Sequence, residues 1–222
     1  MINIFKVVNL TCSYDCQQKT SPIVINASLT LEDGKIYDLS GPSGSGKSSF
    51  LKALSKLIHI DSGDMYLNEV NSNGIANSLW RKHVLLFMQQ TSLLDLSVRD
   101  NILLPFSYEV RKNESMPTEK DMRKILDRLL LEDVSLDDNA LELSGGQQAR
   151  IAFIRNYLTK PNILLLDEVD ASLDEVSAEA LWSLVDDACD AGASVLRIRH
   201  KDSDGRAYKA FTINSQVLSE VR

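Results

Sequence analysis

Gly41-Pro42-Ser43-Gly44-Ser45-Gly46-Lys47-Ser48 is the most informative stretch of this 222-residue sequence. It fits G-x-x-x-x-G-K-[ST], a glycine-rich loop that joins a strand to a helix. Glycines let the backbone curl so that successive N–H groups point at phosphate oxygens, and the following helix adds its positive end. The candidate phosphate-binding residues are Gly41, Ser43, Gly44, Ser45, Gly46, Lys47, Ser48 and Ser49.

Two side chains of this loop predict its chemistry. Lys47 would supply a positive charge to the β- and γ-phosphates, and Ser48 a hydroxyl ligand to Mg²⁺. A chance match is the alternative, but a short strand over 35–40 precedes the loop and an amphipathic helix over 48–60 follows it. We therefore expect a nucleotide-binding site.

The rest of the chain alternates strands with helices. Strands are predicted over 4–10 and 23–31, followed by a turn at Asp33-Gly34 and a buried strand over 84–88. Hydrophobic periodicity predicts helices over 122–131, 144–158 and 174–190, strands over 163–167 and 193–199, and a short β tail over 207–217. This order indicates an α/β fold with a parallel sheet, a β-rich start and a helical insert.

Composition excludes several classes of protein. Lys and Arg total 24 and Asp and Glu total 31, and a net charge of −7 argues against broad non-specific nucleic-acid binding. No apolar run approaches the roughly 20 residues that span a bilayer, and no signal peptide is recognisable, so we expect a soluble cytosolic chain. Three cysteines, Cys12, Cys16 and Cys189, give no disulfide framework. Cys12 and Cys16 are predicted to be free thiols, and the alternative is that they form half of a metal site.

A second glycine motif, Leu143-Ser144-Gly145-Gly146-Gln147, begins the helix predicted over 144–158. Ser144 and Gln147 have the spacing of a capping box, so a well-capped helix is one interpretation. However, two glycines in a first helical turn reduce stability, which makes sense if a phosphate must approach that backbone closely.

The apolar strand over 163–167 ends in two carboxylates, Asp167 and Glu168. In α/β sheets, ligands bind at the carboxyl ends of strands. Asp167 is therefore a candidate Mg²⁺ ligand, and Glu168 a candidate for the base that orients or deprotonates an attacking water. A strand followed by an ordinary acidic turn is the alternative.

The phosphate loop, L-S-G-G-Q and the apolar strand ending in D-E, in this order, resemble the ATP-binding cassette (ABC) ATPases over nearly the whole chain. The resemblance implies that Tyr14 stacks on adenine. It also implies that Gln89, at the start of a Q-loop-like stretch ending at Asn101, acts in catalysis and on Mg²⁺. Ala171-Ser172-Leu173-Asp174 resembles the D-loop, and His200 the switch histidine. Taken singly, these features also fit a core tyrosine, a surface glutamine, a helix capped from Ser172 to Glu175 and a satisfied histidine.

The fold implied by the resemblance is an ABC ATPase nucleotide-binding domain. It has a RecA-like parallel-sheet core, an N-terminal antiparallel β subdomain and a helical signature subdomain. In one domain over 1–222, residues 1–90 and 159–222 would form the β subdomain and catalytic core, and 91–158 the helical subdomain. Two copies would form a head-to-tail dimer. Each ATP, with Mg²⁺, would lie between the phosphate loop of one copy and Ser144, Gly145, Gly146 and Gln147 of the other.

The implied function is that of the ATP-hydrolysing subunit of an ABC transporter, at the inner face of the membrane and without nucleic-acid partners. It would drive export, of iron or another metal, through a separate multi-span permease, because the chain most resembles the compact ATPase of bacterial iron exporters. Leu93, Leu94 and Leu96 are candidates for the permease contact, with a core role the alternative. Other readings are a soluble iron–sulfur assembly ATPase and a P-loop small-molecule kinase.

One pair of charges departs from the family pattern. In this fold the strand before the phosphate loop lies beside the strand before the switch histidine, and both are normally apolar. Asp38 lies three residues before Gly41, and Arg197 three before His200. An unpaired buried charge is very costly, so we predict a buried ion pair between Asp38 and Arg197, or failing that Arg199. Solvent exposure of both at the sheet margin is the alternative.

Overall fold

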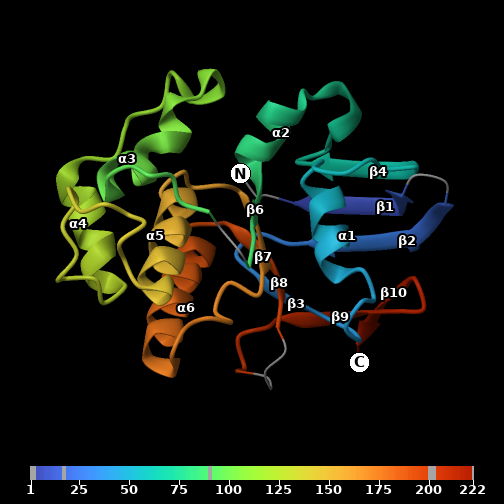
Figure 1. Cartoon of the computed structure of the whole chain (residues 1–222). Helices are drawn as coiled ribbons and strands as arrows, with labels where there is room; N and C mark the ends of the chain where they lie inside the picture. Colours follow the sequence, from blue (N-terminus) through green and yellow to red (C-terminus); the bar gives the residue numbers. More distant parts are fainter. Residues whose placement is uncertain (1–3, 17–18, 90–91, 200–203, 222) are drawn as a thin grey trace. The chain divides into compact units, whose positions relative to one another are not determined.

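The computed structural model describes residues 4–16, 19–89, 92–199 and 204–221, and its ribbon is shown in Figure 1. The chain divides into two compact units, which are described separately. The sheet unit comprises Met1–Leu86, Asn162–Glu168 and Ala188–Arg222. The helical unit comprises Phe87–Pro161 and Val169–Asp187.

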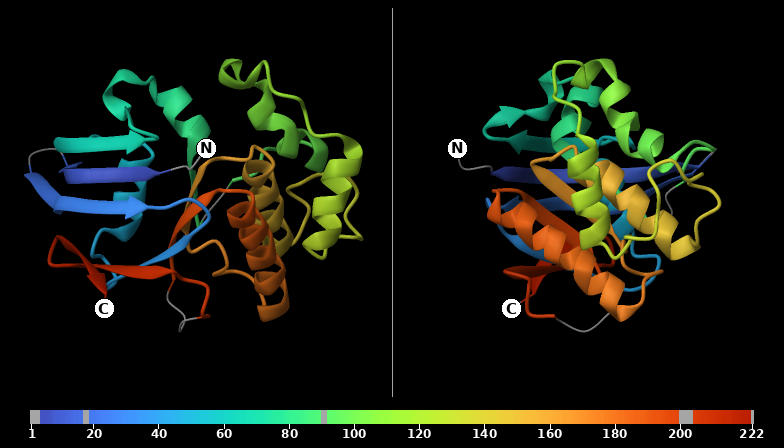
Figure 2. Two further views of the ribbon diagram at one scale, coloured as in Figure 1. Left: turned by 180° about the vertical axis from the view of Figure 1, so that it is seen from behind. Right: turned by 90° about the vertical axis from the view of Figure 1, so that its left-hand side faces the viewer.

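The first sheet of the sheet unit is antiparallel, with the strand order β2-β1-β4-β5. Its strands are β1 (Phe5–Cys16), β2 (Lys19–Leu31), β4 (Ser62–Leu67) and β5 (Val70–Asn71). Figure 2 shows β1, β2 and β4 side by side. Phe5, Val7 and Leu10 are buried, and a register shift between Val7 and Leu10 keeps the buried side chains on one face across the irregularity.

The second sheet has the order β10-β9-β3-β8-β7-β6. Its strands are β3 (Ile36–Ser40), β6 (Val84–Phe87), β7 (Ile163–Asp167), β8 (Ser194–Ile198), β9 (Lys209–Asn214) and β10 (Val217–Val221). Strands β9, β3, β8 and β7 are parallel neighbours, and β10 pairs antiparallel with β9. The carboxyl ends of β3 and β7 therefore lie on the same edge, which is where an α/β sheet binds ligands. The predicted α/β fold is confirmed.

Helix α1 (Lys47–Leu54) follows β3, but the prediction of a helix over 48–60 is wrong at its C-terminal end. Lys56 has a left-handed φ of 56°, which ends the helical path. Its ammonium group donates to the carbonyl of Ser72 and, at 3.2 Å, to that of Ile75. Helix α2 (Asn77–His83) was not predicted, because Trp80 is its one buried residue and gives no apolar periodicity.

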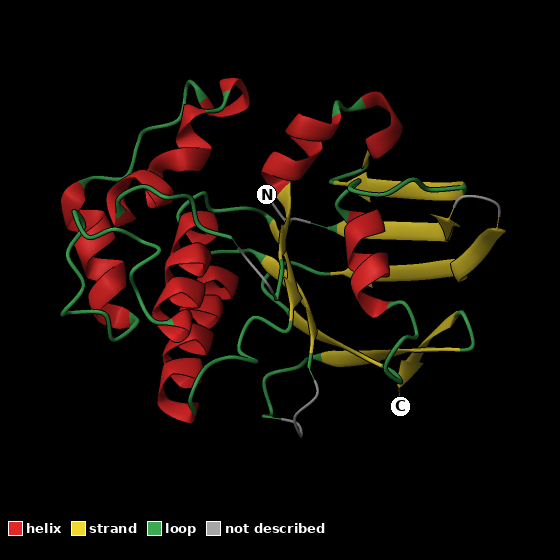
Figure 3. Ribbon diagram, in the orientation of Figure 1, coloured by secondary structure: helices red, strands yellow, loops and turns green. Residues whose placement is uncertain are grey.

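The helical unit contains α3 (Val98–Leu103), the 3₁₀ turns Leu104–Ser107 and Glu109–Arg111, α4 (Glu119–Arg128), α5 (Gly145–Tyr157) and most of α6 (Glu175–Asp190) (Figure 3). Helix α4 begins and ends three residues earlier than the predicted range of 122–131. Thr118 and Asp121 form a capping box at its start, and Leu130 adopts a φ of 56° beyond its end.

Within the described ranges, no helix has both the length and the hydropathy to cross a membrane.

Cys12 is a free thiol whose pKa is raised to about 11 by burial. The side chain of Cys16 is outside the described part. No group of three or more potential metal ligands of the His, Cys, Asp or Glu type is found among the described residues.

Candidate nucleotide-binding site

The phosphate loop joins β3 to α1 in the predicted strand–loop–helix order. Gly46 has a φ of 95°, and a Cβ there would lie 2.5 Å from Ile23 Cγ2. A Cβ on Gly41 would lie 2.3 Å from the carbonyl oxygen of Ile213. Only glycine fits at these two positions, because the backbone is left-handed at Gly46 and sterically crowded at both.

The mouth of this loop is open. A Cβ on Gly44 would meet no atom of the described residues within 4 Å. The first turn of α1 has no acidic residue and its N-cap supplies no side-chain hydrogen bond. The Ser45 hydroxyl is buried and has no hydrogen-bond partner among the described residues, an arrangement that costs about 1–3 kcal/mol. These features fit an anion that accepts hydrogen bonds.

Lys47 holds its charge inside the loop. Its Nζ donates to the carbonyls of Gly41 at 2.8 Å and Pro42 at 3.0 Å, and the residue is only 6% exposed. Ser43 is exposed, and Ser49 is half-buried in the first turn of α1. A phosphate at the loop would give the Lys47 ammonium an ionic partner in place of neutral carbonyls, which is a stronger interaction.

Ser48 and Asp167 meet at the edge of the sheet. The Ser48 hydroxyl donates to Asp167 Oδ1 at 3.0 Å. Burial raises the pKa of the Asp167 carboxyl, the charge of Glu168 adds to this, and the hydrogen bond from Ser48 opposes it. A hydroxyl hydrogen-bonded to a buried carboxylate fits Mg²⁺, which prefers oxygen ligands.

Glu168 is half-buried and has a φ of 50°. A left-handed conformation is uncommon for a residue other than glycine, and such residues cluster at functional sites. This backbone conformation turns the chain directly at the end of β7, next to Asp167. Glu168 therefore occupies the same edge of the sheet unit as Ser48.

Gln89, in the helical unit, lines a small cavity of about 10 Å³. This is about the size that one water occupies. The cavity is also lined by Phe87, Met88, Ala149, Ala152, Phe153, Asn156 and Val169. Gln89 thus lines the same cavity as α5 and as Val169, the residue that follows Glu168 in the sequence.

The predicted capping box at the start of α5 is confirmed. Ser144 Oγ accepts from the Gln147 N–H at 3.3 Å, and Gln147 Oε1 accepts from the Ser144 N–H at 2.9 Å. However, a Cβ on Gly145 would meet no described atom within 4 Å, and one on Gly146 would meet none closer than 3.9 Å. Packing within the described chain therefore does not require these glycines, which leaves the helix start open to an external group.

In the D-loop-like segment, the side chain that caps the start of α6 is Asp174. The alternative of a helix capped from Ser172 to Glu175 is therefore wrong. Asp174 accepts from the N–H and the hydroxyl of Ser177 at 2.9 and 2.8 Å, and these bonds lower its pKa. Nearby, the Trp182 indole donates to the buried Asp170 carboxylate at 3.2 Å. This contact between Trp182 and Asp170 was not predicted from the sequence.

Two predicted site residues have limited description. The backbone of Tyr14 lies in β1 and pairs with Ser21, but its side chain is outside the described part. His200 lies outside the described residues altogether. Their roles stay predictions.

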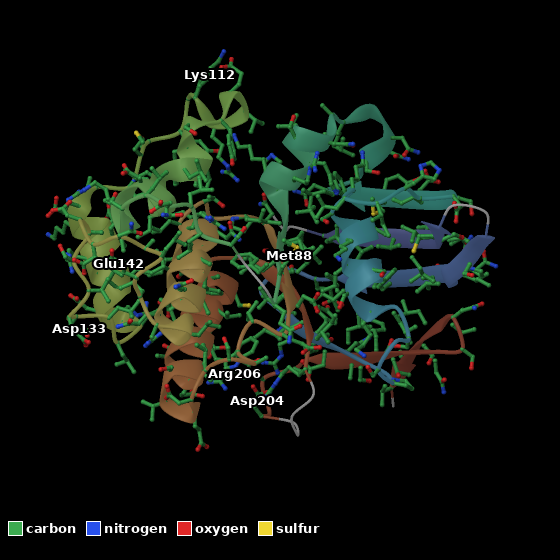
Figure 4. The ribbon with its side chains drawn as sticks, viewed as in Figure 1. Met88, Lys112, Asp133, Glu142, Asp204 and Arg206 are labelled. Carbon is green, nitrogen blue, oxygen red and sulfur yellow. The ribbon has the colours of Figure 1, made fainter. Side chains whose placement is uncertain are left out.

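The predicted ion pair between Asp38 and Arg197 is confirmed, and the solvent-exposed alternative is wrong. The two residues are direct partners on the parallel strands β3 and β8, and Arg197 Nε donates to Asp38 Oδ1 at 2.6 Å. A second carboxylate that contacts Arg197 was not predicted from the sequence. Asp204 accepts from both terminal nitrogens of Arg197, at 3.0 and 2.7 Å, and also pairs with Arg199 and Arg206. Figure 4 shows Asp204 and Arg206 close together.

A glycine-rich phosphate loop before a helix, with a hydroxyl–carboxylate pair at the same sheet edge, defines a P-loop nucleotide-binding protein. The profile of the ABC transporter family matches residues 24–171, and the chain belongs to this family as an ATP-binding subunit with ATPase activity.

Curated relatives agree with this assignment. The probable iron export ATP-binding protein FetA of Escherichia coli is 31% identical over 86% of this chain and 84% of its own length. The lipoprotein-releasing system ATP-binding protein LolD of Ehrlichia canis is 31% identical over 100% of both chains. The methionine import ATP-binding protein MetN 1 of Listeria monocytogenes is 33% identical over 78% of this chain but 52% of its own length.

Solved structures show the same fold. A dimeric bacterial ABC transporter cassette superposes with a TM-score of 0.80, at 24% identity, over 98% of this chain and 99% of its own. A dimeric post-hydrolysis state of an ATP-binding cassette bound to ADP and Pi gives a TM-score of 0.78 at 23% identity, over 98% and 99% of the two chains.

Proposed function

We propose that this chain drives export through a separate multi-span permease and works as a head-to-tail dimer with two ATP molecules at its interface. The observation that carries the proposal is the start of α5, where a Cβ on Gly145 would meet no described atom within 4 Å and one on Gly146 would meet only Ser172 O at 3.9 Å and Leu173 Cδ2 at 4.0 Å. A second copy of the chain, presenting its bound nucleotide, supplies a reason for that opening.

Within one copy, the phosphate loop would bind the triphosphate. The N–H groups at the start of α1 and the Lys47 ammonium would contact the β- and γ-phosphates, and the Ser45 hydroxyl would gain an acceptor, which it does not have among the described residues. Ser48, Asp167 and Gln89 would hold Mg²⁺, which neutralises phosphate charge as the reaction proceeds. Tyr14 would stack on the adenine.

Across the dimer, Ser144 and the N–H groups of Gly145, Gly146 and Gln147 would face the γ-phosphate bound by the other copy. The positive end of a helix stabilises a nearby anion by about 0.3–1 kcal/mol, and more when partly buried. Closure of the dimer would also exclude bulk water from the reacting groups. ATP would therefore favour the dimer, and hydrolysis would favour its opening.

Hydrolysis itself would depend on Glu168, with His200 as the second catalytic side chain. Glu168 would orient the attacking water and accept its proton, which becomes acidic as the bond to the γ-phosphorus forms. The leaving group is ADP, and the new P–O bond carries the water oxygen into inorganic phosphate.

Export is supported by how the relatives match. This chain spans 84% and 100% of FetA and LolD, whose names describe export and release, but 52% of a methionine import ATPase. Iron, the cargo in the name of FetA, is the first cargo to test, and lipoprotein release is the second.

The permease contact would lie in the helical unit. Leu94 and Leu96 are 44% and 43% exposed, whereas Leu93 is 6% exposed and therefore a core residue. An apolar contact at Leu94 and Leu96 would place this chain peripherally at the cytoplasmic face of the membrane. The alternative reading as an iron–sulfur assembly ATPase predicts a soluble scaffold as the partner.

Two variants test the assigned roles. Glu168→Gln should retain ATP and form a stable dimer with MgATP while hydrolysis stops, because the water-orienting base is lost and the phosphate site is kept. Lys47→Ala should weaken ATP binding itself. Size-exclusion chromatography measures dimer formation, and the nucleotide that stays bound to the purified protein measures ATP retention. Equal ATP retention by the two variants would contradict these roles.

A third experiment tests the transport assignment. The chain, tagged and expressed in its native host, should co-purify with a multi-span membrane protein. Deletion of that protein should raise cellular iron if iron is the cargo. Co-purification with a soluble scaffold alone would overturn the transport proposal.

A further inference from the structure

The side chain of Asn101, on α3, is fully buried and makes its hydrogen bonds to one short loop. Its Oδ1 accepts from the N–H of Leu94 at 2.8 Å. Its Nδ2 donates to the carbonyls of Leu94, Leu96 and Ser97 at 3.1, 3.3 and 3.0 Å. One amide thus satisfies both backbone groups of Leu94 and two further carbonyls, which no apolar or acidic residue of similar size can do.

This arrangement fixes the loop that displays the two exposed leucines. A loop with apolar side chains in solvent usually has freedom to move, and a contact with it would then have to order it first. Here the backbone on both sides of Asp95 is held by Asn101, and the Asp95 carboxylate accepts from Asn139 Nδ2 at 2.8 Å. Leu94 and Leu96 are therefore presented on a preordered backbone.

The same loop is bonded to the segment that leads to Ser144. The N–H of Ala140 donates to the Leu96 carbonyl at 3.0 Å, and Ser97 and Asn139 form a bridge. On α3, the N–H groups of Val98 and Arg99 donate to the carbonyls of Asp138 and Leu136, both at 2.9 Å.

The segment over 141–143, which precedes the capped start of α5, is hydrogen-bonded to a side chain of α5. Gln148 Nε2 donates to the carbonyls of Leu141 at 3.1 Å and Leu143 at 2.8 Å. The hydrogen bonds thus run without a gap from the leucine loop, through residues 136–143, to the first turn of α5.

We propose that Asn101 is a positioning residue that joins the Leu94–Leu96 loop and the start of α5 into one rigid element. It acts on the nucleotide only through Ser144, and this part of the inference rests on the proposed ATP-sandwiched dimer. Because the leucines and Ser144 belong to one element, a partner that docks on Leu94 and Leu96 also sets the position of Ser144.

The test uses Asn101→Leu, which keeps the approximate volume and removes all four hydrogen bonds. Amide hydrogen exchange in the full-length chain should accelerate about tenfold or more at both Leu94 and Ala140, because the loop and the bonded segment lose a shared support. In the Glu168→Gln background, MgATP-driven dimerisation should weaken about tenfold, since each tenfold step corresponds to about 1.4 kcal/mol. Affinity of the monomer for MgATP should stay within about twofold, because the phosphate loop lies in the other unit.

Arg111→Met is the matched control. Arg111 is also buried in the helical unit, and it donates to Glu114 at 2.7 Å and to the Thr159 carbonyl at 3.4 Å, neither of which belongs to the Leu94–Leu96 loop. It should lower the melting temperature without weakening dimerisation. Equal weakening of dimerisation by both variants, at equal loss of melting temperature, would make Asn101 a stability residue only and overturn the proposal.

The remaining outcomes separate this inference from the proposed dimer. Unchanged exchange at Ala140 in Asn101→Leu would overturn the rigid link whatever the dimer does. If Glu168→Gln alone fails to dimerise with MgATP, the proposed dimer and the action of Asn101 through Ser144 both fall. Accelerated exchange at Leu94 and Ala140 would then still uphold the rigid element.

Discussion

Arg197 on β8 and Asp38 on β3 form an ion pair in which the arginine side chain is 0% exposed and the carboxylate 20% exposed. The pair lies in the parallel sheet that carries the phosphate loop, in direct register between neighbouring strands. Asp204 completes the arrangement by accepting from both terminal nitrogens of Arg197. The guanidinium is thus satisfied on three nitrogens, which a buried arginine requires.

Arg197→Met should destabilise the chain by about 3–5 kcal/mol, because it leaves the Asp38 carboxylate without its buried cation. Urea unfolding of the purified chain measures this. Arg206→Met, which removes a more exposed partner of Asp204, should cost less than about 1 kcal/mol. In Asp38→Leu/Arg197→Met part of the lost stability should return, because the unpaired Asp38 carboxylate is removed while Asp204 still lacks its two bonds from Arg197. Equal costs for Arg197→Met and Arg206→Met would contradict this account.

The acid limit of stability should depend on Asp204. Burial alone would raise the pKa of its carboxyl, but the hydrogen bonds from Arg197 and Arg206 and the nearby guanidinium groups hold it below its usual value. A depressed carboxyl pKa contributes stability above the unfolded value of about 3.9, and this stability is lost as the pH falls below that value. Asp204→Asn should therefore be less stable than wild type at pH 7, with a difference that shrinks below about pH 4. Urea midpoints at a series of pH values test this, and a constant difference would argue against it.

Asp167→Asn should raise the melting temperature of the nucleotide-free chain at pH 7 by a few degrees, about 2–4 °C per kcal/mol for a chain of this size. The raised pKa of the Asp167 carboxyl means that its charged form is unfavourable in the fold, an effect fully present above the folded pKa. The gain should shrink as the pH falls through the raised pKa of Asp167 towards the unfolded value of about 3.9, because the wild-type carboxyl takes up a proton over this range. The same variant should lose the Mg²⁺ dependence of ATP binding, and a destabilised Asp167→Asn at pH 7 would contradict this account of the site.

Gly145→Ala should separate folding from function. A Cβ there meets no described atom within 4 Å, and alanine in a helix is favoured over glycine by about 0.5–1 kcal/mol, so stability should rise. Dimerisation of the Glu168→Gln chain with MgATP should weaken, because the added methyl group lies where the neighbour's phosphate would approach. Gly74→Ala, also open, is the control that should leave dimerisation unchanged. Normal dimerisation of Gly145→Ala would argue that the opening serves no ligand.

Local patterns predicted a large part of the fold and of the candidate site. The strand over 163–167 was predicted with its observed bounds, because an unbroken apolar run suits a parallel strand buried on both faces. The Ser144–Gln147 capping box followed from spacing alone. The Asp38–Arg197 pair needed the strand order of the family as well, since the two residues are far apart in sequence.

Features that depend on distant contacts were not predicted. The end of α1 at Leu54 depends on Lys56, whose ammonium group is bonded to the carbonyls of Ser72 and Ile75. The role of Asp204 depends on how the chain returns after β8, although an acidic residue near Arg197, Arg199 and Arg206 in the sequence was an available signal. The burial of the Asn101 amide was not predicted, because its partners are backbone groups and backbone groups leave no pattern in the sequence.

The most direct test of the proposed ATP sandwich is the structure of the Glu168→Gln chain with MgATP. We expect a two-fold dimer in which Ser144 of one copy lies within hydrogen-bond distance, about 3 Å, of the γ-phosphate bound at Lys47 of the other. A nucleotide-loaded assembly in which Ser144 contacts no γ-phosphate of a neighbouring copy would contradict the account.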